Sequence, residues 1–137
     1  MVGKGEINFN MQIVTAAVIE KDGNILIAKR KKGDPLENKW EFPGGKLKPS
    51  ETPEGCLKRE LREEFDIDAE VGVFIGSSTF AYKHLSIELL AYRVARTSGV
   101  FEVKVHEEIR WVPPEELSQY NFSEADQPIV RKIMAEI

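Results

Sequence analysis

Three glutamates lie within five residues near the middle of the chain, at Glu60, Glu63 and Glu64. Like charges at helical spacing repel each other by roughly a few tenths of a kcal/mol per pair. A divalent cation bound between them would relieve this repulsion, because hard ions such as Mg²⁺ prefer oxygen ligands. The alternative is a solvated acidic face that binds nothing. The surrounding residues must decide between a metal site and a charged surface.

The glutamates lie on a segment that carries the signals of an α-helix. Thr52 is a favoured N-cap residue and Pro53 suits the first helical position. Apolar residues then recur at a spacing of four and form one stripe: Leu57, Leu61 and Phe65. We therefore expect a helix that begins after Thr52 and buries this stripe.

The glutamates lie unevenly around this helix. At about 100° per residue, Glu60 and Glu64 flank the apolar stripe, whereas Glu63 lies further round. Two of the three acids are thus expected at the margin of the core. This position favours a metal site over a solvated face.

The remaining sequence predicts a mixed β-sheet between helices, that is, an α/β (α+β) fold. Asp22-Gly23 is a strong signal for a tight hairpin turn between two short apolar runs. Predicted strands are 13–20, 25–29, 69–80, 84–94 and 108–112, with an extended piece at 40–43. Predicted helical segments besides the central one are a single turn at 114–117 and a terminal amphipathic helix at 123–137.

Length and composition limit the possible functions. The 137 residues predict one domain, 1–137, with a flexible start at 1–10. A net charge of −4 argues against a general nucleic-acid binder, and no apolar run is long enough to span a bilayer. The single cysteine, Cys56, excludes an intrachain disulfide and favours a cytoplasmic setting.

The acidic helix and the loop before it resemble the signature of the Nudix hydrolases, which cleave a nucleoside diphosphate linked to another group. The matching positions keep the family spacing over a 23-residue frame: Gly45, Glu51, Arg59, Glu60, Leu61, Glu63, Glu64 and Ile67. One position departs, because Asp66 stands where the family has a glycine that ends the helix in a left-handed conformation. The resemblance implies a Nudix-type α/β/α sandwich.

The resemblance also implies a metal site and a water-activating base. The cation would be Mg²⁺ or Mn²⁺, with these residues as ligands: Gly44 through its carbonyl, Glu60, Glu63 and Glu64. Arg59 and Glu51 would form an ion pair that braces the loop. Related sequences often place the general base where this chain has Val105, so the candidates here are Glu63, Glu107 and Glu108.

Three further segments, 25–30, 40–46 and 125–129, resemble the MutT branch and its CTP pyrophosphohydrolase relatives. By this resemblance, Arg30 and Lys46 would contact phosphates and Glu41 would support the metal–phosphate cluster. Phe42 and Phe80 would enclose the base or, alternatively, fill the core. The position of Asp126 is implied to read the base, where an ionised carboxylate would select hydrogen-bond donors; otherwise Asp126 caps the last helix.

The expected function is Mg²⁺-dependent hydrolysis of a (deoxy)nucleoside triphosphate, oxidised or not, to the monophosphate and pyrophosphate. The alternatives are hydrolysis of another nucleoside diphosphate derivative, such as ADP-ribose or a dinucleoside polyphosphate, and a non-catalytic nucleotide-sensing domain. The expected partner is a small nucleotide, with no nucleic acid and no membrane. The sequence allows either a monomer or a homodimer.

Overall fold

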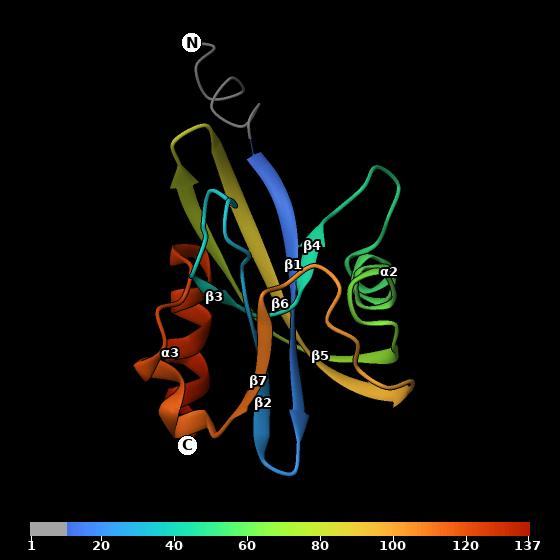
Figure 1. Cartoon of the computed structure of the whole chain (residues 1–137). Helices are drawn as coiled ribbons and strands as arrows, with labels where there is room; N and C mark the ends of the chain where they lie inside the picture. The colour runs from blue at the N-terminus through green and yellow to red at the C-terminus, as the bar shows by residue number, and fades with distance from the viewer. Residues whose placement is uncertain (1–10) are drawn as a thin grey trace.

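The computed structural model describes residues 11–137 and shows a seven-stranded sheet with the order β3-β2-β1-β6-β5, to which β4 and β7 attach (Figure 1). The strands are β1 (Met11–Lys21), β2 (Asn24–Lys29), β3 (Trp40–Glu41), β4 (Gly44–Lys46), β5 (Asp68–Tyr82), β6 (Leu85–Ser98) and β7 (Glu108–Val112). The helices are α2 (Pro53–Phe65), α3 (Gln127–Ala135) and two 3₁₀ helices, η2 (Pro114–Gln119) and η3 (Glu124–Asp126). The predicted flexible start at 1–10 lies outside the described residues.

The two long helices cover opposite faces of the sheet, with α2 on the right and α3 on the left in Figure 1. Alternate residues of β1 divide between the two faces, as the period of a strand requires. Ala16 and Val18 belong to the core on the α3 side, whereas Ala17 and Ile19 belong to the core on the α2 side. The predicted α/β/α sandwich is confirmed.

The sheet is mixed, as predicted. Strand β1 pairs in parallel with β6 over nine residues, from Met11 opposite Ser86 to Ile19 opposite Val94. The other strand pairs are antiparallel. The predicted hairpin is also confirmed, because Asp22 and Gly23 both have positive φ, at 52° and 83°.

Several element boundaries differ from the prediction. Strand β4 was not predicted; Gly44 and Gly45 pair with β1 opposite Ala16 and Thr15. The β5–β6 turn falls at residues 83–84, since β5 continues to Tyr82. The last helix begins at Gln127 rather than at residue 123, because Pro128 lacks the N–H that an interior helical position requires.

Within residues 11–137, no helix is long and apolar enough to cross a membrane.

Candidate active site

Helix α2 forms as its sequence signals predict and carries the acidic cluster. The Thr52 hydroxyl accepts a hydrogen bond from the Gly55 N–H at 3.0 Å, and Leu57, Leu61 and Phe65 are fully buried. Asp66 ends the helix with φ 58° and ψ 38°. Aspartate thus adopts the left-handed conformation for which the family uses glycine, at the modest cost that this residue type pays there.

Arg59 organises the carboxylates around the helix. Its Nε and Nη2 donate to the two oxygens of Glu51 at 2.6 and 3.0 Å, so the predicted ion pair is confirmed. Its Nη1 donates to Glu60 at 2.9 Å and to Glu63 at 3.1 Å. The hydrogen bonds from Arg59 lower the pKa of Glu51 to about 2. One guanidinium therefore neutralises part of the repulsion in the cluster.

Glu64 is the member of the cluster that Arg59 does not hold. Its Oε1 atom is buried and has no hydrogen-bond partner in the described part of the chain. Burial, and next the negative charge of Glu60, raises the pKa of Glu64 to about 9. An enclosed carboxylate oxygen without a partner is costly unless a cation or proton compensates it.

The two glycines of β4 make close approaches that a side chain would prevent, Gly45 to the Glu60 carboxylate and Gly44 to the backbone of β1. A Cβ atom on Gly45 would lie 2.5 and 2.6 Å from the carboxylate oxygens of Glu60. A Cβ atom on Gly44 would overlap the carbonyl of Thr15 in β1. Only glycine allows this backbone to reach both the sheet and the acidic helix.

A cavity of about 250 Å³ lies beside this cluster and is lined in part by residues of β1 and β6. It brings together seven predicted site residues from distant parts of the chain: Arg30, Glu41, Phe42, Gly44, Lys46, Glu64 and Asp126. Tyr82 also lines it, but Phe80 does not; the Phe80 ring packs edge-on against Tyr82 with centroids 4.6 Å apart. Of the two aromatic residues that the resemblance selected, Phe42 thus lines this cavity and Phe80 does not.

Asp126 is buried at the end of this cavity. Its Oδ2 accepts the backbone N–H of Phe42 at 2.9 Å, and it makes no side-chain capping bond to helix α3. The capping alternative is therefore wrong. Burial raises the pKa of Asp126 well above its usual value. This direction favours the neutral carboxyl group over the ionised carboxylate expected from the sequence.

A chain of hydrogen bonds joins Arg30, which follows β2, to Glu41 in β3 and then to His106. Arg30 donates from Nε and Nη2 to the two oxygens of Asp34, both at 2.8 Å, and from Nη1 to Glu41 Oε1 at 2.8 Å. The second oxygen of Glu41 lies 2.8 Å from His106 Nε2. Two carboxylates thus engage three of the five N–H donors of Arg30, which lines the cavity, and Lys46 is exposed at the cavity rim.

A smaller chamber of about 180 Å³ adjoins the main cavity and shares Arg30, Glu41 and Glu64 with it. Val105 and His106 line this chamber, but neither Glu107 nor Glu108 lines either cavity. The side chain of Glu107 is exposed, and Glu108 pairs with Arg110 at 2.8 Å. The structure therefore does not bring these two candidate bases to the acidic cluster.

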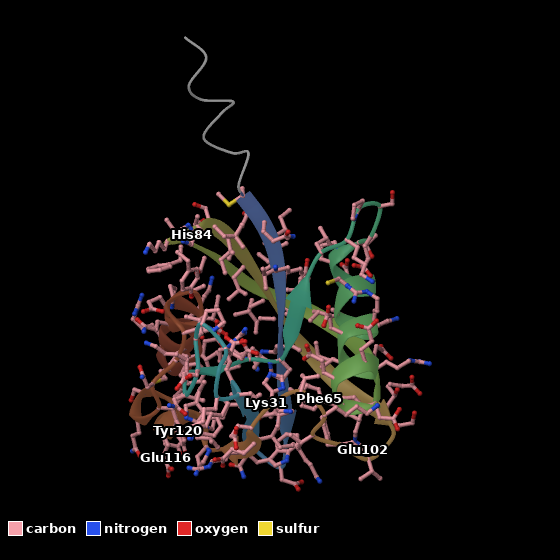
Figure 2. The ribbon with its side chains drawn as sticks, turned by 45° about the horizontal axis from the view of Figure 1, so that its top comes forward. Lys31, Phe65, His84, Glu102, Glu116 and Tyr120 are labelled. Carbon is pink, nitrogen blue, oxygen red and sulfur yellow. The ribbon has the colours of Figure 1, made fainter. Side chains whose placement is uncertain are left out.

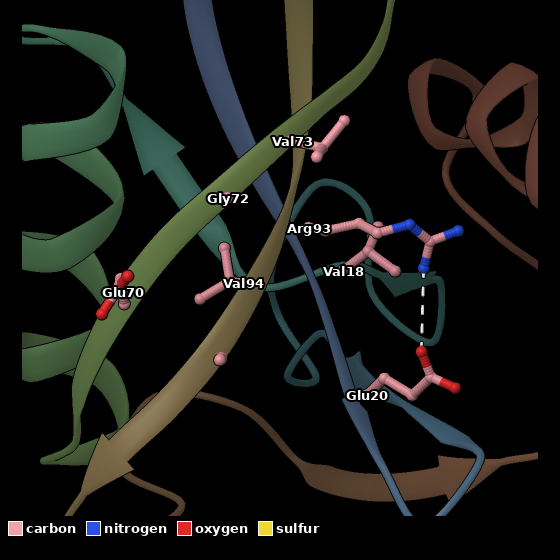
Figure 3. Close-up of a pocket in the computed structure, with 8 residues that line it drawn as sticks. Val18, Glu20, Glu70, Gly72, Val73, Arg93 and Val94 are labelled. Carbon is pink, nitrogen blue, oxygen red and sulfur yellow. Dashed lines mark ion pairs between the residues drawn. The ribbon is translucent and has the colours of Figure 1, made fainter.

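Another hollow, of about 390 Å³, lies elsewhere, along β5 and β6 (Figure 3). Glu20 and Arg93 face each other across it at 3.8 Å, among valines and with no acidic cluster. Its size alone does not make it the reactive site. The acidic helix, the unpartnered oxygen and the buried Asp126 all lie at the 250 Å³ cavity.

Comparison with known proteins identifies the family to which this architecture belongs. The model of the NUDIX domain matches residues 14–132. A CTP pyrophosphohydrolase of Escherichia coli K12 is 39% identical over 122 residues, which cover 89% of this chain and 90% of that protein. The chain therefore belongs to the Nudix hydrolases and is an enzyme of that family.

Two further relatives support this assignment. An 8-oxo-dGTP diphosphatase of Escherichia coli K12 is 28% identical over 123 residues, which cover 90% of this chain and 95% of that protein. The solution structure of the Escherichia coli ORF135 protein superposes with a TM-score of 0.81 at 38% identity, covering 92% of this chain and 90% of that one. Both similarities extend over nearly the whole length of the chain.

Proposed function

We propose that this enzyme hydrolyses a nucleoside triphosphate to the monophosphate and pyrophosphate. Water attacks a phosphorus atom of the bridge, its oxygen forms the new P–O bond, and the bond from that phosphorus to the bridging oxygen breaks. The observation that carries the proposal is the Glu64 Oε1 atom, which is buried without a hydrogen-bond partner among residues 11–137, at the wall of a cavity that Asp126 also lines. The MutT-like relatives support the choice of a triphosphate.

A divalent cation fits the residues around Glu64. Within residues 11–137, no three His, Cys, Asp or Glu side chains are spaced to hold a metal ion by themselves. The ligands would thus be Glu60, Glu64 and the Gly44 carbonyl, with Glu63 next to them and the remaining positions filled by water and substrate phosphate. When bound, Mg²⁺ or Mn²⁺ would neutralise phosphate charge and lower the pKa of coordinated water.

The protein residues around this site position the reacting groups. Arg59 and Glu51 brace the β4 loop against helix α2, and Lys46 is placed to attract phosphate at the rim. Of the three candidate bases, only Glu63 shares the hydrogen-bonded cluster, through Arg59. We therefore assign the removal of a proton from the attacking water to Glu63.

The nucleobase of the substrate would occupy the part of the cavity near Phe42, Tyr82 and Asp126. A neutral carboxyl group both donates and accepts hydrogen bonds. Asp126, fixed by the Phe42 N–H, can therefore pair with a base edge that presents a donor beside an acceptor, as well as with one that presents donors. Cytosine and guanine-like bases both satisfy this requirement. The single buried cysteine agrees with a cytoplasmic enzyme.

A panel of nucleotides assayed with Mg²⁺ for release of pyrophosphate or phosphate tests the proposal. We expect pyrophosphate from at least one nucleoside triphosphate, and no turnover by Glu60→Gln. Millimolar Mg²⁺ should also raise the melting temperature of the wild type more than that of Glu60→Gln. Activity confined to ADP-ribose or a dinucleoside polyphosphate would overturn the triphosphate assignment.

A further inference from the structure

His106 occupies an unusual position for one of only two histidines in the chain. Its side chain is 5% exposed and its Nε2 lies 2.8 Å from Glu41 Oε2. Its ring lies flat on Phe65, with centroids 5.4 Å apart and planes 8° apart. Phe65 is the last residue of helix α2, next to Glu64. His106 therefore contacts both the acidic helix and a carboxylate that lines both chambers.

The hydrogen bond determines which nitrogen of the ring is protonated. A carboxylate oxygen accepts hydrogen bonds, so the proton must lie on His106 Nε2. His106 Nδ1 is buried and has no partner within residues 11–137. A proton on Nδ1 instead would leave a buried N–H without an acceptor and would break the bond to Glu41.

Glu41 is fixed by two donors, one on each oxygen. Arg30 holds Oε1 and His106 holds Oε2, both at 2.8 Å. Without His106, the carboxylate would be tethered at one oxygen only and could rotate about its terminal bond. Because Glu41 lines both chambers next to Glu64, its orientation affects the charge around the reacting phosphates.

We propose that His106 is a positioning residue that fixes the Glu41 carboxylate and links it to the end of helix α2. This inference rests on the proposed hydrolysis, because its effect on rate is expressed through Glu41. The loop that carries His106 is itself attached to the floor of the site, since the next N–H, that of Glu107, donates to Lys29 O at 2.8 Å. The residue after Val105 thus serves the site by holding an acid rather than by acting as a base.

The test compares His106→Leu, which keeps an apolar side chain on Phe65, with His106→Gln, which restores an N–H donor toward Glu41. With the preferred triphosphate, His106→Leu should lower kcat by roughly 10- to 100-fold, the range typical of residues that orient a metal-site group. KM should stay within about threefold, because the hydrogen bond orients Glu41 without touching the nucleotide. His106→Gln should recover most of the lost kcat.

His84→Leu is the matched control, because His84 is exposed in the β5–β6 turn, away from Phe65 (Figure 2). In a Glu41→Gln background, His106→Leu should cost less than about threefold, since its effect passes through the Glu41 carboxylate. Equal losses in His106→Leu and His106→Gln, or additive losses with Glu41→Gln, would reduce His106 to a packing role. An unchanged kcat in His106→Leu would overturn the inference outright.

A measurement on the wild type separates this inference from the proposed function. Nitrogen-15 shifts of the His106 ring should show the proton on Nε2, whether or not any triphosphate is hydrolysed. A proton on Nδ1 would overturn the positioning role even in an active enzyme. Absence of pyrophosphate release by the wild type would instead overturn the proposed function while the ring tautomer still tests the contact with Glu41.

Discussion

Replacing Gly45 by alanine should slow hydrolysis by roughly 100-fold while leaving the fold intact. The added Cβ atom would lie 2.5 and 2.6 Å from the two oxygens of Glu60. Ordinary contacts of a Cβ atom lie at 3.4–4 Å, so the carboxylate must retreat by about 1 Å. A displacement of that size at a reacting centre costs on the order of 10²-fold, or about 2.7 kcal/mol of transition-state stabilisation.

The assay is steady-state release of pyrophosphate at saturating Mg²⁺, together with the melting temperature of each variant. Gly76→Ala in β5 is the matched control, because the three atoms nearest to its new Cβ all belong to the flexible side chain of Lys132. We expect Gly76→Ala to keep kcat within about twofold, and Gly45→Ala to melt within a few degrees of the wild type. Wild-type kcat in Gly45→Ala would refute the reasoning that Glu60 must lie directly against the β4 backbone.

Three further variants test the roles of individual acids. Glu64→Gln should abolish turnover. In EDTA at pH 7, its free energy of unfolding, measured with urea, should exceed that of the wild type by about 3 kcal/mol. The reason is that the raised pKa of Glu64 makes the wild type lose stability as the pH rises from 4.5 toward about 9. Equal urea midpoints at pH 7 would contradict this. The raised pKa of Asp126 predicts that KM rises with pH, a dependence that Asp126→Asn should lack; parallel pH profiles would argue against base recognition by Asp126. Glu107→Gln should keep kcat within about threefold, and a loss above 100-fold would restore Glu107 as the general base.

Local sequence signals were sufficient for helix α2 and the contacts made along it. The cap at Thr52 and the stripe of Leu57, Leu61 and Phe65 depend on residues that are close in sequence, and they follow from helical periodicity and from the chemistry of single side chains. The pairing of Arg59 with Glu51 was instead implied by the resemblance to the Nudix signature. The left-handed Asp66 was also predictable, because its position in the motif requires that conformation.

The walls of the cavity were only partly predictable. Resemblance to the MutT branch selected Arg30, Phe42, Lys46 and Asp126, which the structure brings to one cavity from separate parts of the chain. It did not select Tyr82, which lies two residues beyond Phe80 on the same face of β5, where the pairing with β6 is regular. Alternation of side chains does not separate the two residues; contact with η3 does, because the Ala125 N–H donates to the Tyr82 hydroxyl at 3.1 Å. Strand β4 was missed because two glycines carry no strand signal by themselves.

The sequence by itself determined the chemistry of this protein: an acidic helix with an arginine that pairs with Glu51, the motif of a Nudix hydrolase, and a candidate residue for contact with the nucleobase. Only the tertiary structure decided how these groups act on one another. It paired His106 with Glu41, moved Glu107 away from the cavities, and enclosed Asp126 and one oxygen of Glu64. The physical reason is that burial and long-range hydrogen bonds depend on which strands become neighbours. Burial and such hydrogen bonds change the pKa of a carboxyl group more than its neighbours in sequence do.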